Sequence, residues 1–424
     1  MWLWRLLGVL IALSCGLALG GCGPGVERLL HHPAADRPLD YDWSIAPHLD
    51  VTPAIAVRGV PGAAFNLHPY LHFDGRRFFM MWTSTTRDEA EAGGVVRWAV
   101  SDDGLNWTAM GDLTPGPPAG QRYIARGFWV RDGQLLALAV LSDAADMDKS
   151  GYVTLAFEPP KGPSLVPGVW REAGPVLRGA AMNYPPKKLE DGRWLETSRD
   201  WRAGPAFVVN GGADLTDWRK VAIADPPRRL EWRLWPETPA SRRPEGEGWK
   251  SWLRAPRPHL TAPKLDEPVW WRLPDGRLRA LARDNSHGGR LYTATADASG
   301  EHWSRWRVTN MPDATSKVAA LKVSEGLYVL ASNPRPTPRE RNPLVLTVSS
   351  DGSRFDRMVV LRDAPTRRRI DGQRKTPGYQ YADMITVGDW LFVAYARNKE
   401  DIEVVRLPLA SLKAVPATPA GSRR

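Results

Sequence analysis

The chain has 424 residues and carries 57 Lys and Arg against 47 Asp and Glu, a formal net charge of +10 that favours acidic partners. Cys15 and Cys22 are its only cysteines and both lie near the N-terminus, which excludes a disulfide-stapled scaffold for the rest of the chain. The eight histidines lack the spacing of a zinc or iron site, so we expect no metal and no other cofactor.

The first segment has the layout of a secretory signal: Arg5, an apolar run from Leu6 to Leu19, and small residues before a cysteine. Leu19-Gly20-Gly21-Cys22 matches the bacterial lipoprotein processing site, at which the cysteine is lipidated and becomes the first mature residue. We therefore expect a lipoprotein signal peptide over residues 1–22 and a lipid-anchored protein of the bacterial cell envelope. An ordinary signal peptide and an N-terminal membrane anchor are the alternatives. Export argues against nucleic acid as the acidic partner.

An apolar run, a two-residue turn and a second apolar run recur six times along the chain. The turns fall at Asp74, Asp132, Asp191, Asp275, Glu325 and Gly388. Asp-Gly pairs tolerate the positive φ of a tight hairpin turn, so each copy predicts a β-hairpin. The spacing suits four-stranded units and predicts an all-β, six- or seven-bladed β-propeller with four-stranded antiparallel blades. The segment around Asp50–Val57 would complete a seventh blade.

In four units a later strand is closed by an acidic turn and an aromatic residue. The pairs are Asp103 and Trp107, Asp214 and Trp218, Asp297 and Trp303, and Asp351 and Phe355. We expect the Asp side chain to accept hydrogen bonds from turn amides and the ring to pack between strands of its own sheet. The segment from Ser101 to Trp107, SDDGLNW, resembles the Asp-box of the sialidase-like (BNR) propellers, in which the box is structural. This resemblance spans residues 60 to 410 and implies the same fold.

These patterns divide the chain into a signal peptide (1–22), a tether and entry strand (23–57), a propeller catalytic domain (58–412) and a disordered tail (413–424) rich in Ala and Pro. An insertion from Asp225 to His259 carries four tryptophans among prolines and arginines. It joins the third and fourth blades on the face opposite the hairpin turns. A sugar platform or lid and an inter-blade filler are equally consistent with it.

Propellers usually bind ligands on the face opposite the first hairpin turns of their blades. Residues just before each first strand and just after each second strand should gather there. The candidates from this geometric filter and the resemblance are Asn66, His68, Arg126, Asn183, Tyr184, Arg199, Glu267, Arg283, Lys317, Arg341, Tyr379, Tyr381 and Arg397. Arginines that converge on a cleft would favour a carboxylate-bearing sugar, whereas the structural alternative is that each binds carbonyls of a neighbouring blade.

The segments ARDNSHGGRLY from Ala282, NPRPTPRERNPL from Asn333 and GYQYADMI from Gly378 are similar to motifs of exported sialidase-like proteins. Sialidases use three arginines on the sialate carboxylate, a tyrosine nucleophile helped by a glutamate, and an aspartate acid/base. The resemblance implies Arg283, Arg341 and Arg397 as carboxylate binders, Tyr379 or Tyr381 as the nucleophile, and Glu267 as the residue that polarises it.

One departure matters at the first blade. Sialidases enter it with Arg-Ile-Pro, whereas this chain has Asn66-Leu67-His68-Pro69. The segment FNLHPYL from Phe65 is instead similar to propellers that release rhamnose from glucuronic acid by hydrolysis or by elimination.

Each of these reactions has its own requirements. Elimination needs a cation, a base and an acid; His68 with Tyr184 or Tyr379, and Arg199 or Arg283, would supply them. Hydrolysis by paired carboxylates would use Glu267 with Asp313 or Asp284.

The sequence thus predicts an exo-acting carbohydrate enzyme, a rhamnosyl-glucuronate lyase or a glycoside hydrolase, that cleaves a terminal bond at an acidic sugar. A true exo-α-sialidase, a non-catalytic glycan-binding propeller and a scaffold protein whose repeats serve assembly only are the alternatives. The expected partner is an acidic oligosaccharide or glycan. We expect a monomer that contacts the membrane only through its lipid anchor.

Overall fold

The computed structural model describes residues 43–145, 151–160, 166–200, 204–221, 223 and 263–417. Cys22 and its signal peptide, and the insertion from Asp225 to His259, lie outside the described residues. In the described part no helix is long and apolar enough to cross a membrane.

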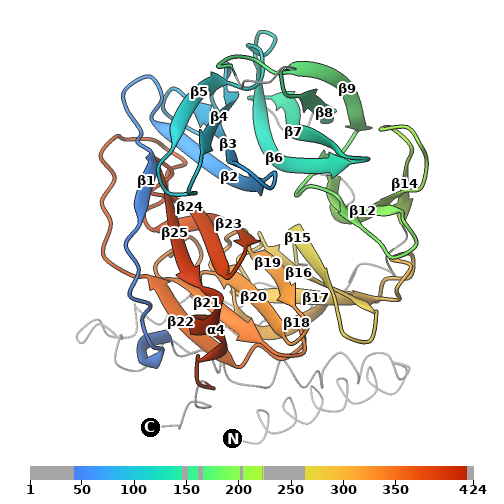
Figure 1. Cartoon of the computed structure of the whole chain (residues 1–424), viewed down its shortest axis with the longest axis vertical. Coiled ribbons are helices and arrows are strands. Elements are labelled where there is room, and N and C mark those ends of the chain that lie inside the picture. The colour runs from blue at the N-terminus through green and yellow to red at the C-terminus, as the bar shows by residue number, and fades with distance from the viewer. Residues whose placement is uncertain are drawn as a thin grey trace, which may run out of the picture.

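Six antiparallel sheets stand as blades around a central axis (Figure 1). The first blade consists of β2 (Phe65–Phe73), β3 (Phe78–Thr85), β4 (Val95–Ser101) and β5 (Thr108–Asp112). The second consists of β6 (Gln121–Arg131), β7 (Gln134–Asp143), β8 (Val153–Glu158) and β9 (Arg171–Arg178). The third consists of β10 (Ala181–Met182), β11 (Lys187–Lys188), β12 (Trp194–Asp200), β13 (Gly204–Asn210) and β14 (Trp218–Val221). In the third blade β10 and β11 both pair with β12, so the inner strand is split in two.

The fourth blade consists of β15 (Leu265–Arg272), β16 (Leu278–Asp284), β17 (Arg290–Ala296) and β18 (Arg307–Pro312). The fifth consists of β19 (Ala319–Ser324), β20 (Leu327–Ser332), β21 (Leu344–Ser349) and β22 (Arg357–Arg362). The sixth consists of β23 (Tyr379–Val387), β24 (Trp390–Arg397), β25 (Asp401–Pro408) and β1 (Ala54–Val57). A short 3-10 helix, η1 (Trp43–Ile45), precedes β1, and α4 (Leu409–Lys413) follows β25.

The two ends of the propeller meet in the sixth blade. β1 pairs antiparallel with β25, with Ala54 opposite Val404, and supplies the outer strand of that sheet. The segment around Asp50–Val57 therefore completes the sixth blade rather than a seventh, and the ring is six-bladed. All six hairpins that the turn pattern predicts are present, as the pairings β2–β3, β6–β7, β11–β12, β15–β16, β19–β20 and β23–β24.

The acidic turn at Asp103 behaves as expected, but the aromatic residues of two later turns do not. Asp103 Oδ1 accepts hydrogen bonds from the amides of residues 105 and 106 at 2.9 and 2.8 Å. The ring of Trp303 in the fourth blade stacks on Phe207 of the third, with centroids 3.6 Å apart, and Phe355 of the fifth blade meets Trp271 of the fourth. The prediction that these rings pack within their own sheet is wrong, because adjacent blades bury more apolar surface in the wedge between them.

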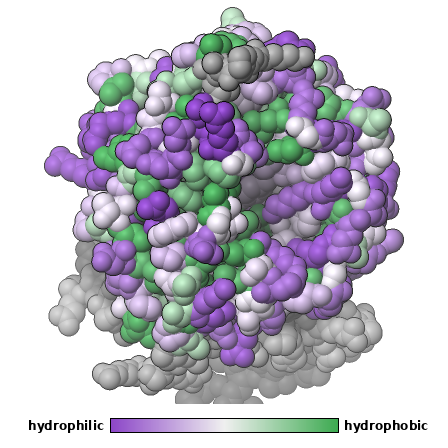
Figure 2. Space-filling model, in the orientation of Figure 1, coloured by the Kyte–Doolittle hydropathy of each residue, from purple (hydrophilic) through white to green (hydrophobic). Residues whose placement is uncertain are grey.

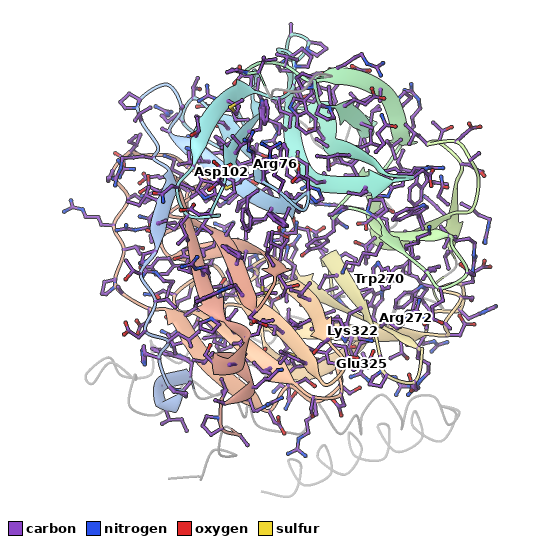
Figure 3. The ribbon with its side chains drawn as sticks, viewed as in Figure 1. Arg76, Asp102, Trp270, Arg272, Lys322 and Glu325 are labelled. Atoms are coloured by element: carbon purple, nitrogen blue, oxygen red, sulfur yellow. The ribbon has the colours of Figure 1, made fainter. Side chains whose placement is uncertain are left out.

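The face with the hairpin turns carries exposed ion pairs. Asp102 pairs with Arg77 at 3.0 Å. Lys322 pairs with Glu325 across the β19–β20 turn (Figure 3). Exposed pairs of this kind contribute little to stability. Figure 2 shows hydrophobic residues scattered among hydrophilic ones, over a face that is hollowed near its middle.

Candidate active site

Four inner strands carry a β-bulge shortly after they begin. The register shifts between Leu67 and Tyr70 in β2, Ala125 and Gly127 in β6, Asp266 and Val269 in β15, and Gln380 and Asp383 in β23. A bulge bends a strand and re-aims a side chain. The side chains at the four bulges are His68, Arg126, Glu267 and Tyr381, and all are buried.

The local sequence explains two of these bulges. His68 and Glu267 have φ of 56° and 45°, and each precedes a proline, Pro69 or Pro268. Proline cannot donate to the strand ladder, so within a sheet it occurs at edges and bulges. A polar residue before proline inside an apolar inner strand is thus a sequence signal for the site.

Arg283, at the end of β16, connects the acidic and phenolic groups of the site. Its Nε lies 3.0 Å from Glu267 Oε2, and its Nη2 donates to Asp266 Oδ2 at 3.1 Å. Its Nη1 donates to Tyr381 Oη at 3.3 Å and to the carbonyl of Thr315 at 3.0 Å. Burial alone would raise the pKa of Asp266, but the charges of Arg283 and of a second arginine outweigh it and lower that pKa. One buried guanidinium therefore holds Glu267 and Tyr381 together.

Two more cations surround the Tyr381 ring. The Arg341 guanidinium lies 5.2 Å from the ring centroid and donates to the carbonyl of Thr315 at 2.9 Å. Lys399 Nζ lies 5.8 Å from the same centroid and donates to Glu89 Oε2 at 2.6 Å. Burial raises the pKa of Tyr381 while the charge of Arg283 opposes this shift, so the neighbouring cations favour charge on the phenol oxygen.

A second group of side chains adjoins Tyr381 through His68. The ring of His68 meets that of Tyr381 edge to face, with centroids 4.9 Å apart. Lys317 Nζ lies 3.7 Å from the Tyr184 ring centroid and 4.6 Å from that of Tyr70, and donates to the carbonyl of Asn183 at 2.9 Å. Burial lowers the pKa of Lys317 to about 7. Burial and the charge of Arg126 hold the pKa of His68 well below its usual range, so this imidazole is neutral.

Several candidates from the sequence are held elsewhere. Tyr379 Oη donates to the carbonyl of residue 364 at 3.2 Å, and its ring packs on Tyr395. Arg397 Nη1 lies 3.1 Å from Glu403 Oε1, within the sixth blade. Of the arginines expected to converge on a cleft, Arg283 therefore contacts Tyr381, whereas Arg397 binds Glu403 instead.

Three further candidates make structural contacts. Asn66 Nδ2 donates to the carbonyl of residue 400 at 2.8 Å, while its Oδ1 accepts from Trp82 Nε1. Tyr184 Oη donates to the carbonyl of residue 318. Arg199 reaches Asp266 Oδ2 at 3.2 Å and so borders the Arg283 cluster.

Lys399 is a site residue that the sequence-based candidates omit, whereas the geometric filter also selects Asp266, which accepts a hydrogen bond from Arg283. Asp266 directly precedes Glu267, and Lys399 lies two residues after Arg397 with a φ of 57°. Their proximity to Tyr381 depends on contacts between blades, which no local pattern encodes. Among the described residues, no group of three His, Cys, Asp or Glu side chains is placed to hold a metal ion.

Residues 76–393 match the family model for the BNR repeat-like domain. The chain belongs to this family. No curated protein matches the sequence.

Solved structures with the same fold include a Dyadobacter fermentans protein of unknown function, with 12% identity over 84% of this chain and 97% of that one (TM-score 0.56). The Trypanosoma rangeli sialidase bound to sialic acid shares 10% identity over 87% of this chain and 60% of its own (TM-score 0.55). An α-L-arabinofuranosidase from Fusarium graminearum shares 10% identity over 85% and 99%, respectively (TM-score 0.51). At these identities the likeness shows the fold.

Proposed function

We propose that this BNR-repeat propeller is an exo-acting glycoside hydrolase that cleaves a terminal glycosidic bond at an acidic sugar. The observation that supports this best is the contact of one buried guanidinium, Arg283, with both Glu267 and Tyr381. A tyrosine beside a carboxylate serves as nucleophile in sialidases, which are exceptions to the usual pair of acidic residues. Sialidases are among the solved proteins that share this fold.

Each residue would have a defined role. Glu267 accepts the phenol proton as the Tyr381 oxygen attacks the anomeric carbon, and the bond from that carbon to the leaving oxygen breaks. Lys317 donates a proton to the leaving oxygen, because its lowered pKa of about 7 suits proton transfer near neutrality. Water then attacks the glycosyl-tyrosine, gives its proton to Lys317 and releases the sugar, while Tyr381 recovers its proton from Glu267. Arg283 and Arg341 stabilise the phenolate character of Tyr381.

Elimination at a uronate is a second candidate, favoured by the state of His68. This imidazole is held neutral among cations, as a base that removes the proton beside a sugar carboxylate must be. The pair of electrons from the broken C–H bond would then expel the sugar on the 4-oxygen. Lys317 would protonate that oxygen.

The test is a product analysis with purified protein on rhamnosyl-glucuronate oligosaccharides and on sialosides. Released rhamnose without ultraviolet absorbance from an unsaturated uronate would support hydrolysis, and released rhamnose with it would support elimination. Released sialate would identify a sialidase. A Tyr381→Phe variant separates the first two reactions, because only hydrolysis through a glycosyl-tyrosine needs the phenol oxygen. Silence on all acidic glycans would overturn the proposed function and favour a binding propeller.

We also propose that the protein is exported and anchored through Cys22, which the Leu19-Gly20-Gly21-Cys22 pattern supports. Cells fed a labelled fatty acid should incorporate the label into the wild-type protein and not into Cys22→Ser. Equal labelling of the two would contradict the proposal.

A further inference from the structure

Arg126 is a buried cation without an acidic partner in the part of the chain that the structure describes. Arg126 is 8% exposed, and its buried Nε makes no hydrogen bond. Within the described ranges, the one hydrogen bond of its guanidinium is a marginal 3.5 Å contact with the carbonyl of the preceding residue, Ala125. Arg283, by contrast, is bound by Asp266 and Glu267. A buried charge without a counter-ion is costly, so this cation is expected to have a ligand.

Specific contacts of the two neighbouring residues hold the bulge that carries Arg126 in place. The following residue, Gly127, has a φ of 101°, and a Cβ there would lie 2.8 Å from Cδ of Pro185 in the next blade. Thr83 Oγ1 accepts a hydrogen bond from the amide of Ala125 at 2.9 Å, which fixes the bulge from the side of the first blade. Only glycine fits this conformation and this close approach without strain, so contacts with both neighbouring blades fix the bulge that carries Arg126.

Arg126 lies near two other basic side chains and near unused polar atoms, and no carboxylate of the described residues forms an ion pair with it. Its charge contributes to the lowered pKa of both His68 and Lys317, so it lies close to both. Next to Lys317, the Nδ2 of Asn183 and the Oγ of Ser316 are buried without hydrogen-bond partners. Buried polar groups are normally satisfied, so several unsatisfied ones in one place point to a polar ligand.

We propose that Arg126 binds an oxyanion substituent of the sugar, a carboxylate or a sulfate, at a subsite on the side of the first and second blades. Arg283 then stays bound to Glu267 and Asp266 instead of reaching for the substrate. This inference rests on the proposed function for the presence of a sugar in the site.

The test is calorimetric titration of the full-length protein with D-glucuronate, sodium sulfate and D-glucose at pH 6. The variants are Arg126→Gln, Arg341→Gln, and Arg97→Gln as a control at an exposed pair with Asp112. The Arg126→Gln change should weaken glucuronate binding about tenfold or more, because a charge-assisted hydrogen bond is lost, and leave glucose binding unchanged. Binding of sulfate as well as glucuronate would indicate a general oxyanion subsite, and glucuronate alone a uronate-specific one.

Two results would overturn the inference. One is glucuronate affinity in Arg126→Gln equal to that of Arg97→Gln, and the other is an effect seen in Arg341→Gln alone. A second readout needs no sugar: unliganded Arg126→Gln should unfold at a higher urea concentration than wild type, because an uncompensated buried charge has been removed. Lower stability than wild type would mean that Arg126 is structural. If anion binding depends on Arg126 but no glycan is cleaved, the proposed function fails while this inference stands.

Discussion

Gly104 lies in an acidic turn of the first blade, at the contact with the sixth blade that closes the ring. It has a φ of +75°, and a Cβ added there would lie 2.5 Å from Cε1 of Phe392 and 3.2 Å from Cε1 of Phe78. Those two rings already pack with centroids 4.7 Å apart. Gly104→Ala should therefore cost about 1–2 kcal/mol for the left-handed backbone and about 1–3 kcal/mol for overpacking, together about 2–5 kcal/mol.

Gly326→Ala is the matched control. Gly326 has nearly the same φ, +76°, but a Cβ there would meet nothing within 4 Å, so only the backbone cost of about 1–2 kcal/mol applies. Urea unfolding followed by tryptophan fluorescence measures both variants against wild type. If the two variants unfold at the same urea concentration, the close contact of Gly104 with Phe392 and Phe78 does not contribute to the stability of the ring.

Three further predictions concern the site. Tyr381→Phe should reduce kcat by at least about 10³-fold and leave the binding of glucuronate intact, because only the nucleophilic oxygen is lost; activity near that of wild type would exclude Tyr381 as nucleophile. Thr197 Oγ1 donates to the carbonyl of Pro268 at 2.7 Å, beside Glu267. Thr197→Val should lower kcat about tenfold with KM little changed, because the unpaired buried carbonyl costs about 1–3 kcal/mol and shifts the bulge that carries Glu267. Thr197→Ser keeps the hydroxyl and should retain the wild-type kcat. An equal loss of kcat in Thr197→Ser would show that this hydrogen bond does not position Glu267. Burial raises the pKa of the Glu196 carboxyl from 4.5 to about 8. Between pH 4.5 and about pH 8 this carboxyl is therefore protonated in the folded state and ionised in the unfolded chain, so the free energy of unfolding should fall as the pH rises. Glu196→Gln should show a smaller fall in its urea midpoint between pH 5 and pH 8, and equal falls would contradict the assignment.

The repeated turns made the blades predictable, because a tight hairpin depends on residues adjacent in sequence. The number of blades was not, since β1 pairs with β25 across nearly the whole chain. A local pattern in Asp50–Val57 cannot reveal which sheet accepts it. The packing of Trp303 on Phe207 was missed for the same reason, because it joins two blades.

The composition of the site was partly predictable. Position in the blade selected Arg283, Glu267 and Tyr381, and these side chains do meet. The same filter could not separate Tyr381 from Tyr379 two residues earlier, because the bulge in β23 decides which of them faces the site. It also selected Arg126 and Arg283 alike. In the structure Arg283 pairs with Asp266 and Glu267, whereas no carboxylate of the described residues pairs with Arg126.

If Tyr381 is the nucleophile, it forms a covalent bond with the sugar whose anomeric carbon it attacks, which is sialate in a sialoside and rhamnose in a rhamnosyl-glucuronate. An activated fluoro-glycoside of rhamnose or of sialate, which slows release of the intermediate, should add one sugar to the intact protein, and peptide mass spectrometry should locate it on the peptide that contains Tyr381. Tyr381→Phe should stay unlabelled, while Tyr379→Phe should label like wild type. Rapid turnover of the reagent with no adduct, or an adduct on any other residue, would contradict the account.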